Sequence, residues 1–227
     1  MNVYCSFDNK IVKNFDKELF LKIENYLLLS GVASDKEDFS VIKERLVNPP
    51  RLLPEEFAYE VFYVILASGF KQKIAKEKFL QIKSFIENGG CVLPENLLVI
   101  FGNKNKINAI CRVWNNRDNY CNNFYLQPDI DSKMKYLATL PHIGEITKNH
   151  LARNLGINQV KYDVWIQRLG IALYGDDTMV DGFPLSDCVK CACDKMFDKL
   201  VCDTKLPRGY IDVVLWKACQ IGVLFFK

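Results

Sequence analysis

The chain has 227 residues, of which 49% are hydrophobic and 25% are charged, and its net charge is +3. This composition is typical of a globular protein and excludes an intrinsically disordered or fibrous chain. A chain of this length buries its hydrophobic residues in one large domain or in two small lobes.

The basic residues are concentrated in the middle of the chain. Residues 68–117 contain nine Lys and Arg against three Asp and Glu, and residues 133–168 contain six against two. Because the net charge is only +3, the rest of the chain is acidic. A protein with one face turned toward phosphates would have this distribution, and so would a protein with ordinary solvated helix faces.

Neither a secretory signal nor a membrane-spanning segment is expected. The first residues lack a basic start followed by an uninterrupted apolar stretch. Charged residues such as Glu60 and Lys217 interrupt the longest apolar tracts, 57–70 and 210–226, as in buried core helices. We therefore expect a soluble, cytoplasmic protein whose nine cysteines are reduced.

Apolar residues recur with helical spacing along most of the chain, and Asn, Gly and Pro separate the periodic segments. No tandem repeat or low-complexity linker is apparent. The pattern predicts an all-α protein with about nine or ten helices joined by short loops. The helices are expected at residues 16–29, 55–68, 71–87, 104–114, 132–140, 145–155, 163–173, 185–200 and 209–225.

The most informative segment, residues 135–169, contains a helix, a tight turn and a second helix from about Glu145. Pro141 ends the first helix because proline cannot continue it, and Gly144 allows a close approach of the backbone. The first amides of the second helix have no partner within the helix, and the helix dipole makes this end positive. Such a helix start binds phosphate without reading the base sequence, and Lys148 adds positive charge.

This segment resembles the helix-hairpin-helix motif. Together with Asp163 it is similar to the DNA glycosylase superfamily that includes endonuclease III, adenine glycosylase and 8-oxoguanine glycosylase. Asp163 follows Gly144 by nineteen residues and opens a helix, with Trp165 and Arg168 behind it, like the catalytic aspartate of that family. The resemblance implies that this carboxylate stabilises positive charge on the sugar, or activates water, as the glycosidic bond breaks. A simple helix N-cap is the alternative interpretation of Asp163.

The resemblance implies further site residues. The expected phosphate contacts are His142, Gly144, Ile146, Thr147 and Lys148. The candidates for a pocket that stacks on a flipped base are Phe70, Tyr136 and Trp165, although aromatic residues at helical spacing more commonly belong to the core. His142 replaces the first glycine of the family's turn, and histidine tolerates a left-handed backbone better than most residues. Residues 68–70 lack the glutamine with which the family often probes the DNA stack.

The family divides by whether a lysine attacks the sugar, which produces a Schiff base and strand cleavage. Ile146 occupies the lysine position of endonuclease III and cannot react. Lys135, six residues before Pro141, occupies the lysine position of 8-oxoguanine glycosylase and is the expected nucleophile. Lys133 lies about 200° around the same helix and faces elsewhere. If Lys135 is only a surface lysine, Asp163 with water would make the enzyme a monofunctional glycosylase.

The resemblance also implies a two-lobed all-α fold that binds DNA in a cleft between its lobes. Residues 55–169 would form the lobe with the helix-hairpin-helix, at about 132–156, and residues 1–54 and 170–227 would form the second lobe. We expect the protein to be a monomer that binds double-stranded DNA with a damaged or modified base. Lys135 points by analogy to an oxidised purine, while alkylated and enzymatically modified bases stay open.

Two other functions are compatible with these patterns. A non-catalytic DNA-binding module would keep the hairpin as a phosphate clamp and would not need Asp163 or Lys135. An unrelated all-α interaction protein would contain the turn sequence only by coincidence.

Four cysteines lie close together near the end of the chain: Cys188, Cys191, Cys193 and Cys202. Some relatives of endonuclease III hold an iron–sulfur cluster with four such ligands. The gaps here, of two, one and eight residues, fit neither that spacing nor paired zinc knuckles. We expect thiols in the core of the protein and neither an iron–sulfur cluster nor another cofactor, while a monovalent cation at the hairpin turn stays open.

Overall fold

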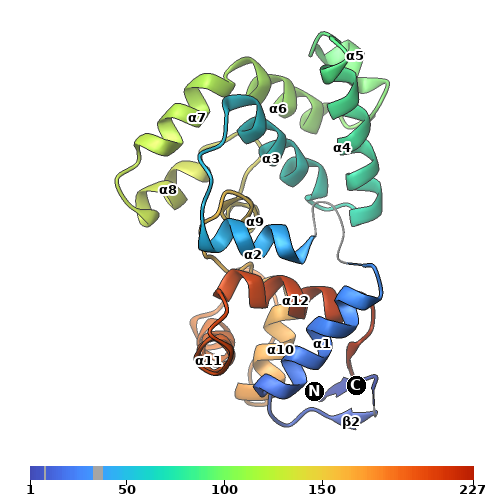
Figure 1. Cartoon of the computed structure of the whole chain (residues 1–227), viewed down its shortest axis with the longest axis vertical. Coiled ribbons are helices and arrows are strands. Elements are labelled where there is room, and N and C mark those ends of the chain that lie inside the picture. The colour runs from blue at the N-terminus through green and yellow to red at the C-terminus, as the bar shows by residue number, and fades with distance from the viewer. Residues whose placement is uncertain (8, 33–37) are drawn as a thin grey trace. The chain divides into compact units, whose positions relative to one another are not determined.

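The computed structural model describes residues 1–7, 9–32 and 38–227. Within these residues the chain forms twelve helices and three short strands (Figure 1), which confirms the predicted helical fold class. The chain divides into a terminal unit, Met1–Pro49 with Asn158–Lys227, and a central unit, Pro50–Ile157. Among the described helices, none is both long enough and apolar enough to cross a membrane.

The central unit is built around α3, which carries apolar residues on every side. Helices α4, α6, α7 and α9 pack against it (Figure 1). Pro54 begins α3 at a position where its missing N–H is not needed. Within this apolar helix the buried Glu60 accepts a hydrogen bond from Asn154 of α9 (3.3 Å). The helices of the unit are α3 (Pro54–Ala67), α4 (Gln72–Glu87), α5 (Pro94–Leu98), α6 (Lys104–Asn115), α7 (Arg117–Leu126), α8 (Ile130–Leu137) and α9 (Thr147–Asn154).

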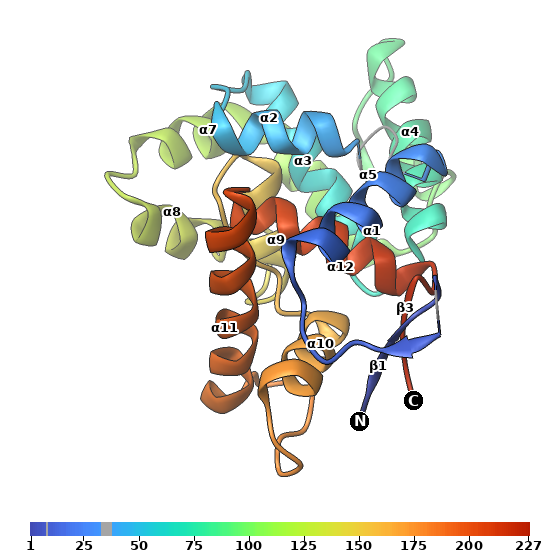
Figure 2. The same cartoon turned by 60° about the horizontal axis from the view of Figure 1, so that its bottom comes forward.

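The terminal unit joins both ends of the chain. Its β1 strand pairs antiparallel with β2 on one side and with β3 on the other, so that Val3 lies opposite Phe226 (Figure 2). Helix α12 is buried along most of its length and contacts α1, α2, α10 and α11. The elements of the unit are β1 (Val3–Cys5), β2 (Lys10–Ile11), α1 (Lys17–Leu29), α2 (Phe39–Val47), α10 (Val164–Tyr174), α11 (Asp187–Thr204), α12 (Arg208–Gln220) and β3 (Leu224–Phe226).

The predicted last helix, 209–225, is wrong after residue 220. Helix α12 ends at Gln220, and Gly222 adopts a left-handed backbone (φ +78°). The Val223 N–H donates to the Ala218 carbonyl (2.9 Å), which is the hydrogen bond of a glycine-terminated helix end. The residues that follow form β3 instead.

Helices α2, α5 and α7 were not predicted from the sequence. Helix α7 is polar over most of its length and buries only Cys121 and Phe124, so its apolar periodicity is weak. Helix α5 has five residues, which is too short for a periodic pattern.

The division of the chain differs from the expected boundary at residue 169. Residues 158–169 belong to the terminal unit, because α10 packs on α11 and α12. The expected catalytic residue Asp163 therefore lies in the terminal unit, whereas the turn at 138–146 lies in the central unit.

Helix α10 lies on α11 at a point of close backbone approach. A Cβ atom at Gly170 would lie 2.5 Å from Sγ and 2.8 Å from Cα of Cys193. Cys193 is buried, and its Sγ contacts the Ile166 carbonyl oxygen at 3.5 Å. This contact holds α10 against the body of the terminal unit. It also holds Asp163, which caps the first turn of α10.

We predict that Gly170→Ala lowers the free energy of unfolding by about 1–3 kcal/mol, the usual cost of overpacking. The clash involves backbone atoms of α11, so it outweighs the roughly 1 kcal/mol that alanine gains over glycine in a helix. Urea unfolding followed by circular dichroism measures the change. Gly144→Ala is the control, because its Cβ would meet open space. Equal midpoints for Gly170→Ala and the wild type would contradict this account of the packing.

Candidate functional site

The turn between α8 and α9 is anchored by two apolar side chains. Leu140 and Ile143 are buried in the core of the central unit, and the Ile143 N–H donates to the Leu140 carbonyl (3.1 Å). Between them His142 adopts a left-handed backbone (φ +63°). This is the conformation that favours glycine. A tight turn is thus formed here with histidine in the left-handed conformation.

The start of α9 presents backbone groups at the surface. Gly144 is exposed, with open space where a side chain would be. Its N–H donates to Thr147 Oγ1 (2.8 Å), and its carbonyl accepts from the Lys148 N–H (2.8 Å). The half-buried Ile146 caps the helix by backbone conformation alone. The positive end of the helix dipole therefore lies beside the exposed Gly144.

One acidic residue lies at this helix start. The side chain of Glu145 is 80% exposed and forms an ion pair with Lys148. A lone carboxylate here would repel a phosphate, and the ion pair offsets its charge. Lys148, expected as a phosphate contact, therefore pairs with Glu145 in the unbound protein.

A buried lysine beside the turn was missed in the sequence. Lys106 is 4% exposed, and its ammonium donates to the carbonyls of Leu66 (3.1 Å) and Ser68 at the end of α3. Burial lowers the pKa of Lys106 to about 8. Burial and the positive charge of Lys106 also lower the pKa of His142. The sequence contained one signal for the burial of Lys106: this residue adjoins the apolar face of α6 that Ile107, Ile110 and Val113 form.

The predicted base-pocket residues of the central unit differ in accessibility. Phe70 is 39% exposed, lies edge-on against Phe101 (5.2 Å between ring centres) and has the Lys106 ammonium 4.4 Å from its ring centre. Tyr136 is partly buried against the core, and its hydroxyl donates to the Tyr120 carbonyl (3.2 Å). Phe70 is thus available for stacking, whereas Tyr136 contributes to packing.

The two lysines of α8 lie on different sides of the helix, as its geometry requires. Lys133 lies over the ring of Phe124 (5.4 Å), and Lys135 is exposed. Activation of a lysine by desolvation needs a buried amine, and Lys135 is not buried.

Asp163 is the N-cap of α10. Its Oδ1 accepts hydrogen bonds from the N–H groups of Trp165 (3.1 Å) and Ile166 (3.3 Å). Its Oδ2 lies 3.9 Å from the Lys161 ammonium, and the carboxylate side chain is only 14% exposed. Oδ1 caps the helix and Oδ2 faces Lys161. One carboxylate therefore both caps α10 and lies beside a positive charge.

The loop before Asp163 is held at several points. The Lys161 N–H donates to Oδ2 of the buried Asp212 (3.2 Å). The Tyr162 hydroxyl donates to Asp194, and its carbonyl accepts from Nε2 of the fully buried Gln167 (3.0 Å). These bonds fix the backbone on both sides of Asp163.

Trp165, the third base-pocket candidate, is stacked within the terminal unit. Its ring lies 6.0 Å from that of Phe226, nearly parallel (19°). The Arg168 guanidinium is 5.7 Å from the Trp165 ring centre and forms an ion pair with Asp181 (3.0 Å). Trp165 therefore packs between elements of its own unit.

The expected site residues are thus divided between the units. The central unit contains Phe70, Lys135, Tyr136 and the phosphate-contact residues of the turn, and the terminal unit contains Asp163 and Trp165.

The expectation that the clustered cysteines are core thiols is wrong for three of the four. All four lie on α11, where Cys193 is buried and Cys188, Cys191 and Cys202 are exposed. Within the described part of the chain, no group of three or more His, Cys, Asp or Glu side chains is arranged to hold a metal ion.

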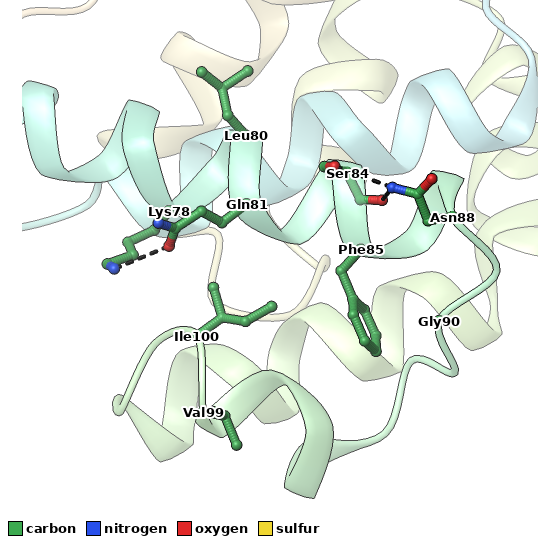
Figure 3. A pocket seen from close by; sticks show the side chains of 9 residues that line it. All are labelled: Lys78, Leu80, Gln81, Ser84, Phe85, Asn88, Gly90, Val99 and Ile100. Atoms are coloured by element: carbon green, nitrogen blue, oxygen red, sulfur yellow. Dashed lines mark hydrogen bonds between the residues drawn. The ribbon is translucent and has the colours of Figure 1, made fainter.

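A surface groove of about 860 Å³ lies between α4 and the segment after α5 (Figure 3). Amide, hydroxyl and apolar side chains share its surface, and the Asn88 amide is bonded to Ser84 within it (2.8 Å to the carbonyl). Its Lys78 side chain forms an ion pair with Glu77. None of the residues that line this groove is an Asp, Glu or His. Its lining residues are Lys78, Leu80, Gln81, Ser84, Phe85, Asn88, Gly90, Val99 and Ile100.

Comparison with known proteins identifies no relative: no family model, no curated protein and no solved structure matches this chain significantly.

Proposed function

We propose that this protein is a DNA glycosylase. It would bind duplex DNA through the turn between α8 and α9 and break the N-glycosidic bond of a damaged or modified nucleotide with the Asp163 carboxylate. The observation that carries the proposal is the backbone of this turn. His142 takes the left-handed conformation that the family's glycine would take, two residues before the exposed Gly144 and four before the cap of α9 at Ile146.

The turn supports binding to the DNA backbone. The exposed Gly144 lets a phosphate approach the main chain beside the positive end of the α9 dipole. Leu140 and Ile143 fix the turn through burial, so little conformational entropy is lost on binding. Contacts of this kind position a protein on DNA and do not read its sequence.

The environment of Asp163 supports a chemical role. Its backbone is fixed on both sides, its carboxylate is mostly buried, and Oδ2 is not used in capping. Breaking the glycosidic bond leaves positive charge on the sugar, and a fixed carboxylate stabilises that charge most when water is largely excluded. The reaction would be completed when water or an amine attacks the sugar of the flipped nucleotide.

A non-catalytic DNA-binding module is the second candidate. The packing of Tyr136 and Trp165 favours it, because two of the three expected stacking residues are engaged within the protein. The two functions share the turn and differ in their need for Asp163.

We predict that Gly144→Val weakens binding to every duplex alike, by about tenfold or more, since a hydrogen bond to a charged group is worth about 1.5–3 kcal/mol. The added side chain meets open space in the protein, so the variant should fold and obstruct only the phosphate. Fluorescence anisotropy with several duplexes measures the loss. Gly102→Val, also facing open space, is the matched control. A loss confined to one sequence would show that the turn reads bases.

We predict that DNA affinity rises as the pH falls from about 7.5 to about 5.5, through His142. The pKa of His142 is lowered in the free protein, so its imidazole is neutral at the start of this range. A bound phosphate favours the imidazolium, so binding takes up a proton, and each unit by which the phosphate raises the pKa adds up to about tenfold in affinity. His142→Asn, which tolerates the same backbone conformation, should bind with a flatter pH profile. Equal slopes in both proteins would remove His142 from the interface.

We predict that Asp163→Asn keeps the fold and DNA binding but lowers base release by about 100-fold or more. Asparagine caps a helix as well as aspartate does, so the variant removes the charge and keeps the cap. Single-turnover assays on duplexes that each carry one oxidised, alkylated or enzymatically modified base measure the rate.

Asp16→Asn serves as the control for this charge removal, because Asp16 caps α1 in the same way (2.9 Å to the Leu19 N–H). A normal rate for Asp163→Asn would remove the carboxylate from the mechanism. DNA binding without base release from any duplex would favour the binding module.

A further inference from the structure

Two exposed cysteines lie close together near the start of α11. Four of the nine cysteines are exposed, and two of these, Cys188 and Cys191, are three residues apart in the first turns of this helix. Residues at this spacing are neighbours on a helix surface, with about 5–6 Å between their Cβ atoms. The two thiols therefore emerge side by side into solvent, as the two ends of a Cys-X-X-Cys segment.

The other two cysteines of α11 are not available to this pair. Cys202 is exposed but follows Cys191 by eleven residues, which is about 16 Å along the helix axis. The Cα atoms of a disulfide are at most about 6.8 Å apart. Cys193 is buried against Gly170, and burial raises the pKa of its thiol to about 12, so it stays protonated and unreactive. Cys188 and Cys191 are therefore each other's only partners on α11.

Lys190, between the two cysteines, contacts the loop before α10. Its ammonium donates a hydrogen bond to Asp194 Oδ2 (2.9 Å) and lies 5.6 Å from the ring centre of Tyr162. Asp194 also accepts a hydrogen bond from the Tyr162 hydroxyl, and Tyr162 directly precedes Asp163. A continuous chain of contacts thus joins the segment between the cysteines to the cap of α10.

We propose that Cys188 and Cys191 form a reversible disulfide that loosens the loop before α10. The oxidant would be a low-molecular-weight disulfide such as glutathione disulfide. Exposed Cys-X-X-Cys pairs are typical of thiol–disulfide exchange, and disulfides of reducing compartments are usually transient and redox-sensing. The inference concerns a modification site on α11, so it does not depend on the proposed function.

The oxidation consists of two thiol–disulfide exchanges. The thiolate of one cysteine attacks a sulfur of glutathione disulfide, which forms a mixed disulfide and expels one glutathione as a thiolate. The thiolate of the other cysteine then attacks the sulfur of the first cysteine and expels the second glutathione. The two cysteines together lose two electrons and two protons, and two molecules of reduced glutathione carry both away.

The disulfide would change the start of α11. It holds the two Cβ atoms about 3.5–4.5 Å apart, which is closer than the roughly 5–6 Å of an undistorted helix. The first turns must therefore tighten when the bond forms. The cap of the helix, in which Ser186 Oγ accepts from the Val189 N–H (3.3 Å), belongs to these turns, and so does Lys190. We expect the contacts of Lys190 with Asp194 and Tyr162 to weaken.

The experiment for the disulfide uses the full chain in mixtures of reduced glutathione and glutathione disulfide. After alkylation of the free thiols, proteolysis with mass spectrometry locates each disulfide. The wild type should form a bond between Cys188 and Cys191 that dithiothreitol reverses. Cys188→Ser and Cys191→Ser should each carry a mixed disulfide with glutathione on the remaining cysteine. Cys202→Ser, which removes another exposed thiol of the same helix, should form the bond as the wild type does.

Hydrogen exchange with mass spectrometry measures the effect on the loop. The N–H of Lys161 is bonded to Asp212, and the N–H groups of Trp165 and Ile166 are bonded to Asp163. These three amides should exchange faster in the oxidised than in the reduced wild type, since loosening of the loop exposes them to solvent more often.

The control for this measurement is the double variant Cys188→Ser/Cys191→Ser, whose loop should exchange at the same rate with and without the oxidant. Three results would each overturn the disulfide: mixed disulfides on both cysteines without a bond between them, a bond from either cysteine to Cys202 or to a second molecule, or no reaction of either thiol. Equal exchange in the oxidised and the reduced wild type would overturn the effect on the loop.

Discussion

The terminal unit depends on a close approach between two helix backbones. Helix α10 reaches α11 because residue 170 has no side chain, and the buried Cys193 fills the space on the other side of the contact. The same surface of α11 supplies Asp194, which holds Tyr162, and α12 supplies Asp212, which holds Lys161. The position of Asp163 thus follows from the packing of three helices. A side chain at position 170 would clash with backbone atoms of Cys193.

The pairing of Asp163 with Lys161 is difficult to explain by stability alone. A helix N-cap contributes about 1 kcal/mol, and capping by Asp163 requires no partner for Oδ2. A partly exposed ion pair adds only about 0–1 kcal/mol. In the proposed reaction a carboxylate fixed on this loop would contribute more, because a fixed charge next to a reacting carbon changes rates.

In the central unit, the buried Lys106 connects several elements near the turn. Its ammonium bonds two carbonyls where α3 ends, lies against Phe70, and acts on His142 through its charge. Carbonyls at a helix end are left without partners by the helix itself, and a buried cation satisfies them while its own burial is costly. Lys106 therefore links the end of α3, the aromatic ring that follows it and the turn at His142. A change at any one of these three would alter the surroundings of the other two.

Local signals in the sequence were sufficient for the strongly periodic helices, for the cap at Asp163 and for the turn at 140–144. Helical spacing, proline, glycine and capping residues act within about four positions of one another, so a pattern in the sequence contains their whole physical cause. The turn around His142 and the start of α10 are of this kind. Helix α7 and strand β3 are not, because one is stabilised by packing on α3 and the other by pairing with β1.

The remaining features were decided by contacts between residues far apart in the chain. Lys106 was counted as surface charge and is buried, because the carbonyls that receive its ammonium lie about forty residues away. The cysteines of α11 were expected in the core. Only Cys193 lies on the side of α11 that packs on α10 at Gly170, and the other three are exposed. The sequence by itself determined the strongly periodic helices and the position of the turn at 140–144. Tertiary structure decided that Lys106 is buried and that the loop before α10 is anchored to α11 and α12, since burial and anchoring depend on the packing of whole helices and not on spacing along the chain.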